Sequence, residues 1–360
     1  MNVISNWIRQ AFSDRQVVLL MSALVFGLIA VYFFADMLAP AIAAVVIAFL
    51  LDGAVTWLKK RGLKHIYAVI ITFVLFMCIA VVVVVTVLPL LFNQVLQFVN
   101  ATPQMVGALQ KYLVSLAANF PDLFNQTQVN GWFTDLGREI AVMGRDVLQY
   151  SVSGVRGAMT TAVYMVLVPV MVFFFLKDKV MITNWFNSVL PVERGLLTKV
   201  WREAVSRSGD YARGKVYEII IVGVTSYVIY KFLGINFATL LAVATGLSVL
   251  IPYIGAAIVT LPVALVAYAQ WGFGSEMLSA VIAYLILQAF DGNLLAPLLF
   301  SEVVKLHPNA IIIAILVFGG IWGLWGVFFA IPLATAAHAV IHSWQEHRDD
   351  GRKSGTTDSA

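Results

Sequence analysis

Polar side chains gather between two strongly apolar stretches of the chain, in the segment 288–308. Gln288, Asp291 and Asn293 stand close together there, and Pro297 follows them. A carboxylate near the middle of a membrane helix costs about 2.5–3.5 kcal/mol on insertion scales, so it usually faces a cavity or a partner group. Carboxylate and amide groups placed in this way could bind a cation, carry a proton or replace the hydration of a polar solute.

Gly292 and Pro297 predict a break in the helix that carries Asp291. Proline cannot donate a backbone hydrogen bond, and open backbone groups at membrane depth are tolerated only where they face protein or a water-filled cavity. We therefore expect Asp291 and its polar neighbours to face a solute or an ion. A loop at the cytoplasmic surface is the alternative interpretation, which the nearby Lys305 and His307 favour.

A second set of ionisable residues lies at the start of the apolar run 216–233. Arg213, Lys215 and Glu218 lie within two helical turns of one another. Arg213 and Glu218 are candidates for binding a solute or an ion. An ion pair at the membrane surface is the alternative interpretation for Glu218, because charged groups near the end of a span often pair there.

Glycine and proline predict two further helix breaks. Pro252 and Gly255 bracket Tyr253, whose polar group is another candidate for binding the solute. The run at 309–344 is too long for one crossing, so it predicts a hairpin. Its candidate hinge residues are Gly319, Gly320 and Gly323. Close helix packing is the alternative reason for glycines at this spacing.

Catalytic motifs are missing from the sequence. It contains no HExxH, GxSxG or P-loop pattern, so it offers no familiar arrangement for hydrolysis or nucleotide-driven chemistry. His338 and His342 stand four residues apart on one helical face, but no third ligand stands in register with them. We therefore expect no enzymatic activity, no bound metal and no cofactor.

The amino-acid composition excludes a water-soluble protein. Of the 360 residues, 61% are hydrophobic and 12% are charged, and the mean hydropathy is +0.90. Soluble domains contain about 45–50% apolar and about 25% charged residues. The chain is therefore predicted to cross the lipid bilayer several times. Its net charge of +4 points to loops that set the membrane orientation and does not indicate nucleic-acid binding.

Apolar runs of about 17–25 residues are long enough to cross a bilayer as helices. The candidate runs are 17–35, 37–58, 66–91, 157–176, 216–233, 236–252, 256–271, 276–290 and 309–344. They predict an all-α fold, a polytopic membrane helix bundle of about eight spans with broken or hairpin helices in the C-terminal half. Whether 236–271 and 309–344 cross fully or are re-entrant stays open.

Amphipathic patterns fill much of the sequence between these runs. Trp132, Leu136 and Ile140 recur at helical spacing, which predicts an amphipathic helical segment outside the membrane. The predicted order is a cytoplasmic interfacial helix at 1–16, three spans at 17–92, extracytoplasmic amphipathic helices at 93–156, the fourth span at 157–176, a cytoplasmic amphipathic loop at 177–215, a C-terminal membrane block at 216–345 and a disordered tail at 346–360.

Basic segments orient the predicted spans. The sequence "KKRGLKH" at 59–65 follows the second span, and the segment 177–215 carries eight Lys or Arg against four Asp or Glu. Positively charged loops stay in the cytoplasm. The N-terminus and the C-terminus are therefore both predicted to be cytoplasmic.

Five motifs together resemble a known family in their order and spacing. They are "FFFLKDK" at 173–179, "DYARGK" at 210–215, "IPYIG" at 251–255, the spacing of Gln288, Asp291, Asn293 and Pro297, and "LHP" at 306–308 with the glycines before Pro332. The chain is similar to the autoinducer-2 exporter family of bacterial permeases, in particular to its PerM-like branch. It departs from the family pattern at Gly292, Lys215 and Ser301-Glu302, where Asn, Gln and Gly-Lys are common.

The resemblance implies a permease of the bacterial cytoplasmic (inner) membrane that exports a small hydrophilic solute or signalling molecule. It also implies a homo-oligomer. Because the sequence has no nucleotide-binding motif, an active step would draw on an ion gradient. A Na⁺/H⁺ or other cation antiporter is the alternative function. A non-transporting membrane scaffold, with partners bound at 177–215 and at the external helices, is the second alternative.

Overall fold

The computed structural model describes residues 15–119, 130–131, 133–134, 137, 142, 154–189, 195–252, 254–300 and 307–357. All regular elements within these ranges are helical, which confirms the predicted all-α class for the described part of the chain. Several residues named above lie outside the description: residues 1–14, Tyr253, Lys305, Trp132, Leu136, Ile140 and the side chains of His338 and His342.

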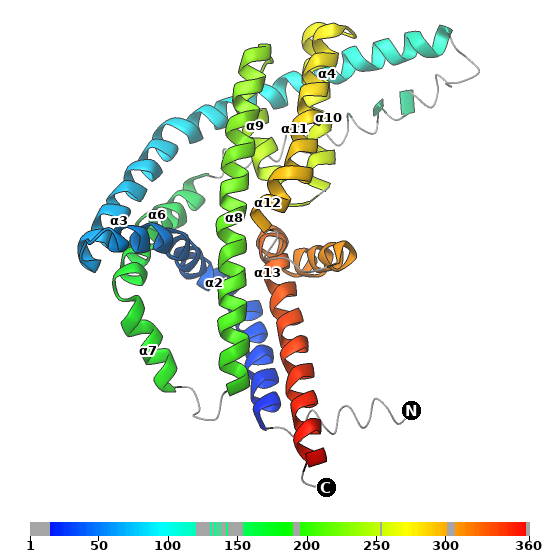
Figure 1. Cartoon of the computed structure of the whole chain (residues 1–360). Coiled ribbons are helices and arrows are strands. Elements are labelled where there is room, and N and C mark those ends of the chain that lie inside the picture. The colour runs from blue at the N-terminus through cyan, green and yellow to red at the C-terminus, as the bar shows by residue number, and fades with distance from the viewer. Residues whose placement is uncertain are drawn as a thin grey trace. The chain divides into compact units, whose positions relative to one another are not determined.

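The described helices follow one another along the chain, and Figure 1 labels most of them. Those described are α2 (Arg15–Lys60), α3 (His65–Val82), η1 (Val83–Val87), α4 (Leu88–Asn119), α6 (Gly154–Lys177), α7 (Lys179–Val189), α8 (Gly195–Leu233), α9 (Ala238–Ser248), α10 (Ile254–Trp271), α11 (Ser275–Phe290), η2 (Asp291–Leu295), α12 (Ala296–Phe300) and α13 (Pro308–Thr357). The elements η1 and η2 are single π-helical turns, in which backbone hydrogen bonds reach five residues back.

Five described helical segments are long and apolar enough to cross a membrane. They are Met37–Lys60, His65–Asn119, Gly209–Leu233, Ile254–Trp271 and Ser275–Phe300. Large apolar side chains stay exposed on them, including Phe232 at 90%, Leu261 at 74% and Leu298 at 72%. Such side chains are stable in contact with lipid, so the chain is a multi-pass membrane protein.

The predicted number of about eight spans is not reached among the described residues. The runs predicted at 157–176, 236–252 and 309–344 contain shorter apolar helices, at Ala162–Lys177, Ala238–Ser248 and Asn309–Gly323. The run predicted at 17–35 belongs to a part of α2 whose side chains are not described.

The apolar run at 66–91 does not end a helix. The backbone continues through η1 into α4 and stays helical to Asn119. The change from an apolar to an amphipathic pattern after residue 92 is therefore a change in what the helix surface contacts, because both patterns are compatible with the same backbone.

Two compact units divide the chain, and each is built from separate segments. Unit 1 consists of residues 1–77, 162–213 and 302–360, and unit 2 consists of residues 78–161 and 214–301. One boundary between them falls inside α8, after Arg213.

The core of unit 1 lies between α2, α3 and α6. Ala44, Val69 and Val172 are fully buried there, one from each helix. The ring of Phe73 meets the ring of Phe173 edge to face at 5.3 Å, an arrangement that aromatic pairs favour. These contacts hold three helices together through small and β-branched side chains.

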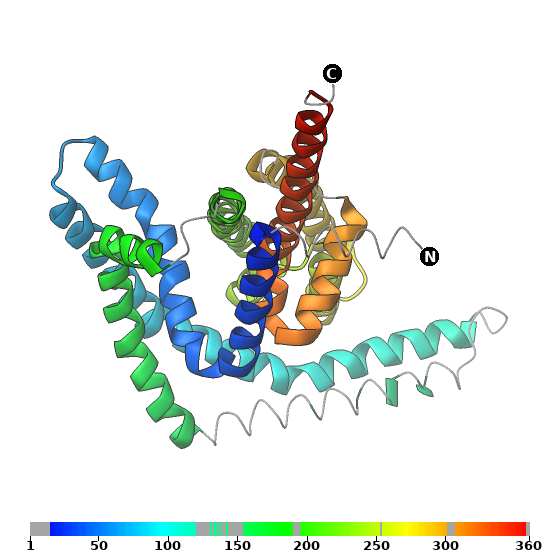
Figure 2. The same cartoon turned by 90° about the horizontal axis from the view of Figure 1, so that it is seen from below.

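The last helix of unit 1 bends sharply within the segment predicted to form a hairpin. Gly323 has φ 59° and ψ −135°, a conformation that residues with a Cβ rarely adopt, whereas Gly319 and Gly320 are helical. Figure 2 shows the orange first part of α13 and its red second part leaving the bend in different directions. Gly326 then lies directly against the carbonyl of Phe318, so the two arms are in contact.

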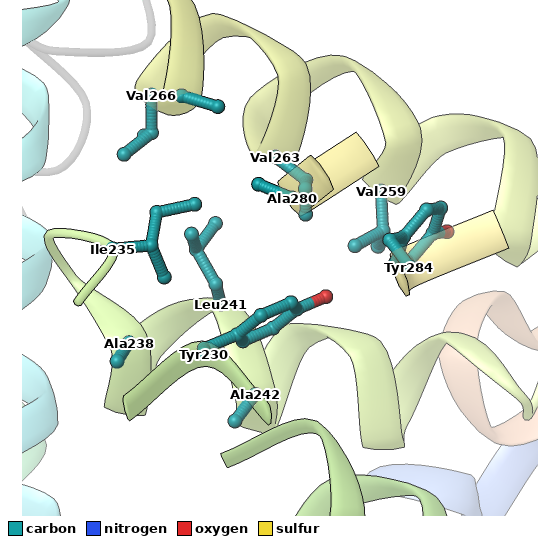
Figure 3. Close-up of a cluster of buried hydrophobic side chains, with 11 residues drawn as sticks. Tyr230, Ile235, Ala238, Leu241, Ala242, Val259, Val263, Val266, Ala280 and Tyr284 are labelled. Atoms are coloured by element: carbon teal, nitrogen blue, oxygen red, sulfur yellow. The ribbon is translucent and has the colours of Figure 1, made fainter. Parts of the chain in front are cut away.

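In the core of unit 2, side chains from the end of α8 pack with side chains from α9, α10 and α11. Tyr230, Leu241, Val263 and Tyr284 are almost fully buried, and Figure 3 shows them among the side chains that fill this space. The hydroxyl groups of Tyr230 and Thr245 lie 3.1 Å apart, which satisfies two polar groups inside an apolar core. This core fixes the position of α8 relative to α11, which matters for the site below.

The long helix α4 packs across the same unit (Figure 1). The side-chain oxygen of Gln94 accepts a hydrogen bond of 2.8 Å from the Leu240 backbone N–H, one of the N–H groups in the first turn of α9 that lack a helical partner. The ring of Phe98 meets Phe237 at 5.6 Å. The start of α9 is therefore held by a polar cap and an aromatic contact.

The helices α8 and α9 approach each other closely where Gly223 lies opposite Gly246. A Cβ built on Gly246 would lie 2.9 Å from the Ile219 carbonyl oxygen and 3.0 Å from the Gly223 Cα. A Cβ built on Gly223 would meet nothing closer than 3.7 Å. Only Gly246 therefore depends on the absence of a side chain, as at other close crossings of membrane helices.

Gly246→Ala is expected to lower the free energy of unfolding by about 1–3 kcal/mol, because the added methyl group would push α9 away from the α8 backbone. The matched control is Gly223→Ala, which adds the same group at an ordinary contact distance. It should stay within about 1 kcal/mol of the parent, since alanine is the better helix former. Both values can be measured by unfolding the purified protein in mixed micelles. Equal losses of unfolding free energy for the two variants would contradict the close approach of α8 and α9 at Gly246.

Candidate functional site

The predicted helix break at Asp291 is instead a widened turn in a continuous helix. The backbone remains helical from Ser275 through η2 to Phe300, and the Ala296 N–H donates to the Asp291 carbonyl, five residues back. In a regular α-helix the ring of Pro297 would clash with the carbonyl four residues earlier, and we attribute the wide turn to relief of that clash. Single π-helical turns of this kind are frequent at functional sites.

Two ionisable side chains of α8 form a buried ion pair. The Lys215 Nζ lies 2.6 Å from the Glu218 Oε2, and the two side chains are only 4% and 3% exposed. Their spacing of three residues places them on one face of the helix. The pair lies inside the candidate span Gly209–Leu233. The ion pair considered for Glu218 is therefore present, and the protein encloses it.

The carboxyl group of Asp291 joins this pair from η2. Its charge interacts with Lys215 and with Glu218, although the two helices are far apart in sequence. Its Oδ1 is buried and has no hydrogen-bond partner among the described residues. Two carboxyl groups and one ammonium group therefore interact within unit 2, where Lys215 and Glu218 are buried and Asp291 is partly buried.

Apolar contacts bring α8 against η2 beside this charge cluster, defined as Lys215, Glu218 and Asp291. Val222 of α8 packs with Leu295 of η2 in one buried cluster. Further contacts come from Gly214 and Phe300: a Cβ on Gly214 would lie 2.8 Å from the Phe300 ring, and the Lys215 Nζ lies 5.2 Å from the centre of that ring. The aromatic face thus gives the Lys215 ammonium a second favourable contact, of the cation–π type.

A hydrogen-bonded chain lies one turn before Asp291. The Gln288 Nε2 donates to the Tyr284 Oη at 2.9 Å, and the Tyr284 hydroxyl donates to the Ala256 carbonyl at 2.5 Å. Tyr284 is 1% exposed and Gln288 is partly buried. The chain joins α11 to the first turn of α10, so a movement of one helix would strain the polar contacts of the other.

The remaining predicted residues lie apart from the charge cluster. Asn293 is exposed, and its Nδ2 donates to the Ala289 carbonyl of its own helix at 2.8 Å. Arg213 belongs to unit 1, where its Nη1 lies 3.6 Å from the Asp210 Oδ1 and its guanidinium lies 4.8 Å from the centre of the Phe49 ring. The structure therefore brings together Asp291 and Glu218, with Gln288 one turn away.

Pro252 and Gly255 do mark an interruption of the helices. Pro252 lies in the turn between α9 and α10, and the Gly255 N–H donates to the Ile251 carbonyl at 2.8 Å. The Ser248 carbonyl faces the Gly255 Cα so closely that any side chain there would collide with it.

Lys215 and Tyr284 were not among the predicted site residues, although Lys215 was noted beside Glu218 as part of a possible ion pair. The spacing of Lys215 and Glu218 was a usable signal, because oppositely charged residues three apart meet on a helix. Tyr284 lies four residues before Gln288, which is also one helical turn, but nothing in that spacing separates a polar network from an ordinary core tyrosine.

The sequence matches a known family along nearly the whole chain. The family described as AI-2E family transporter matches residues 21–346, which include both parts of the charge cluster. The chain belongs to the AI-2E transporter family. The resemblance stated from the sequence motifs is therefore confirmed.

The names of two relatives of this chain agree with this family. PerM of Escherichia coli strain K12, named as a candidate permease, is 42% identical over 96% of this chain and 98% of its own length. YrrI of Bacillus subtilis strain 168, named as a candidate transport protein, is 25% identical over 84% of each chain. Membership of the AI-2E family thus makes this chain a membrane transporter.

Proposed function

We propose that this transporter exports a small hydrophilic solute across the bacterial cytoplasmic membrane and couples the movement to an ion gradient. One observation carries the proposal: Lys215, Glu218 and Asp291 are gathered inside a membrane-spanning helical unit. Ionisable side chains at such depth are costly and are usually found where an ion, a proton or a polar substrate passes.

The charge balance of the cluster supports ion coupling. Two carboxylates and one ammonium group carry a net charge of −1 when all three are ionised, and binding one proton or one monovalent cation makes the cluster neutral. The Asp291 Oδ1 is the acceptor best suited to that event, because it is buried and has no other partner among the described residues. A neutral cluster is far less costly to enclose in a low-dielectric region than a charged one.

Gln288 and Tyr284 are the groups proposed to contact the solute. Their hydrogen-bonded chain begins one helical turn from Asp291 and offers an amide and a hydroxyl group. Amide and hydroxyl groups can replace part of the water around a sugar-like or furanone-like compound. We also retain the cytoplasmic placement of both termini, which the basic segments 59–65 and 177–215 predict.

A cation/proton antiporter is the second candidate, because the proximity of Asp291 and Glu218 would also suit a cation. Lys215 weakens that candidate, since its ammonium group already lies 2.6 Å from the Glu218 Oε2 and repels a second cation. Export of a solute coupled to a proton agrees better with the net charge of −1 that the three ionised groups carry.

The function can be tested with purified protein in proteoliposomes. A panel of polar solutes and of Na⁺, K⁺ and Li⁺ is loaded in turn, a pH or Na⁺ gradient is imposed, and efflux is measured against protein-free vesicles. Gradient-dependent efflux of a polar solute is expected. Efflux of a metal cation alone would select the antiporter, and the absence of flux with every compound under every gradient would contradict a transport function and favour the scaffold.

A further inference from the structure

A cleft of about 390 Å³ opens beside the end of α2, within unit 1. Its volume lies within the range of about 300–1,000 Å³ that is usual for small-molecule sites. The residues that line it are Asp52, Gly53, Thr56, Trp57, Lys60 and Arg213.

The acidic residue of this cleft is already neutralised. The Lys179 Nζ, from the start of α7, lies 2.8 Å from the Asp52 Oδ2. Lys60 takes part in no ion pair with the described residues. Lys60 therefore keeps an unpaired positive charge among the described residues, and Arg213 adds a second positive charge that is paired only at 3.6 Å with the half-exposed Asp210.

The guanidinium group of Arg213 keeps hydrogen-bonding capacity for a ligand. Its distance of 3.6 Å from Asp210 is longer than a good hydrogen bond, and the Asp210 side chain is 52% exposed. Because Phe49 covers the flat face of the group, the N–H edge remains available, and that edge matches the oxygen atoms of a phosphate.

The end of α2 opposes anion binding only weakly. A helix C-terminus carries a partial charge of about −0.5, which acts within the last turn. The Arg61 N–H donates to the Leu58 carbonyl and the Gly62 N–H donates to the Lys59 carbonyl, so the last carbonyls are partly satisfied. Two full positive charges outweigh this partial negative charge, and the cleft favours an anion.

We propose that this cleft binds a phosphate group, held by Arg213 and Lys60, that belongs either to an anionic phospholipid headgroup or to a water-soluble phosphate compound. Trp57 and Lys60 end the candidate span Met37–Lys60, and Trp and Lys at the ends of spans occupy the headgroup region. Basic pockets at that depth bind lipid headgroups. Thr56 also lines the cleft, and its hydroxyl group is of a type that can donate to a phosphate oxygen. The proposal does not depend on which solute is transported.

The site can be tested on the full chain purified in a zwitterionic detergent. Binding of phosphatidylglycerol is measured by native mass spectrometry, and inorganic phosphate and glycerol 3-phosphate are titrated by calorimetry. The double variant Lys60→Gln/Arg213→Gln is expected to weaken binding by at least about tenfold, because charge-assisted hydrogen bonds are lost. Lys59→Gln is the matched control: it removes an exposed charge that does not line the cleft and should change binding by less than about twofold.

A second variant tests the cleft without changing its charge. A Cβ on Gly53 would meet nothing within 4 Å, so Gly53→Leu should fill the cleft, leave the helix intact and cause the same loss of binding. Saturable binding of phosphatidylglycerol alone would assign the phosphate to a lipid, and saturable binding of a soluble probe would assign it to a water-soluble compound. Equal binding by the parent and both variants, or no binding of any probe by the parent, would overturn the proposal.

Discussion

Replacing Asp291 by asparagine is expected to reduce gradient-driven efflux by about 10- to 100-fold, because a charge-assisted interaction worth about 1.5–3 kcal/mol is lost. The amide has nearly the same shape as the carboxylate, but it cannot take up the proton or cation. Lys215 would then be balanced by Glu218 alone, and the cluster would stay neutral in every state of the transport cycle. Efflux should also become insensitive to an imposed pH gradient.

Glu276→Gln is the matched control for this substitution. It makes the same chemical change in the first turn of α11, where Glu276 is exposed and accepts a hydrogen bond only from the neighbouring Ser275 among the described residues. Its efflux should equal that of the parent. If Asp291→Asn reaches the membrane in normal amounts and also keeps full gradient-driven efflux, Asp291 has no part in the mechanism.

Replacing Lys215 by methionine is expected to lower the free energy of unfolding by about 3–5 kcal/mol, because it leaves a carboxylate buried without its partner. The Lys215–Glu218 pair is almost completely enclosed, so water cannot compensate for the loss. The double variant Lys215→Met/Glu218→Gln removes both charges of the pair and should recover part of that stability, while the Asp291 carboxylate still lacks the ammonium group. A buried pair can often be replaced as a whole at little cost.

Unfolding in mixed micelles, followed by the loss of helical signal, measures these differences. Lys231→Met serves as the control, since Lys231 is an exposed lysine near the end of the same helix and should shift the free energy by no more than about 0.5 kcal/mol. If Lys215→Met and the double variant lost the same stability, the pair would contribute nothing through mutual attraction, and the proposed balance of charges in the cluster would be wrong.

The membrane class and most of the helices were predictable from the sequence, because the apolar runs are long and contain few charges. The predicted break at Gly292 and Pro297 was not found, since a single wide turn accommodates the proline while the helix continues. Pattern analysis recognises proline as an interruption but does not show how the neighbouring backbone adjusts. The bend at Gly323 lies within the predicted hairpin, where glycine is the residue best able to adopt the observed backbone angles.

The charge cluster was predictable only in part. Asp291 stood out as an acidic residue within an apolar segment, and the spacing of Lys215 and Glu218 already indicated a pair on one helix. Their meeting across α8 and η2 depends on how the small Gly214 and the large Phe300 fit together. That contact joins residues far apart in the sequence, and no pattern within either segment encodes it.

The interleaving of the two units has a consequence for biosynthesis. Unit 2 is complete once Ser301 has been translated, whereas unit 1 contains the first residues of the chain and still needs its last segment, which begins at Glu302. Protein chains emerge from the ribosome at about 5–20 residues per second and fold largely as units. The early helices of unit 1 therefore enter the bilayer before α13 has been synthesised. A nascent chain that stops after Ser301 would contain every segment of unit 2 but would lack the last segment of unit 1.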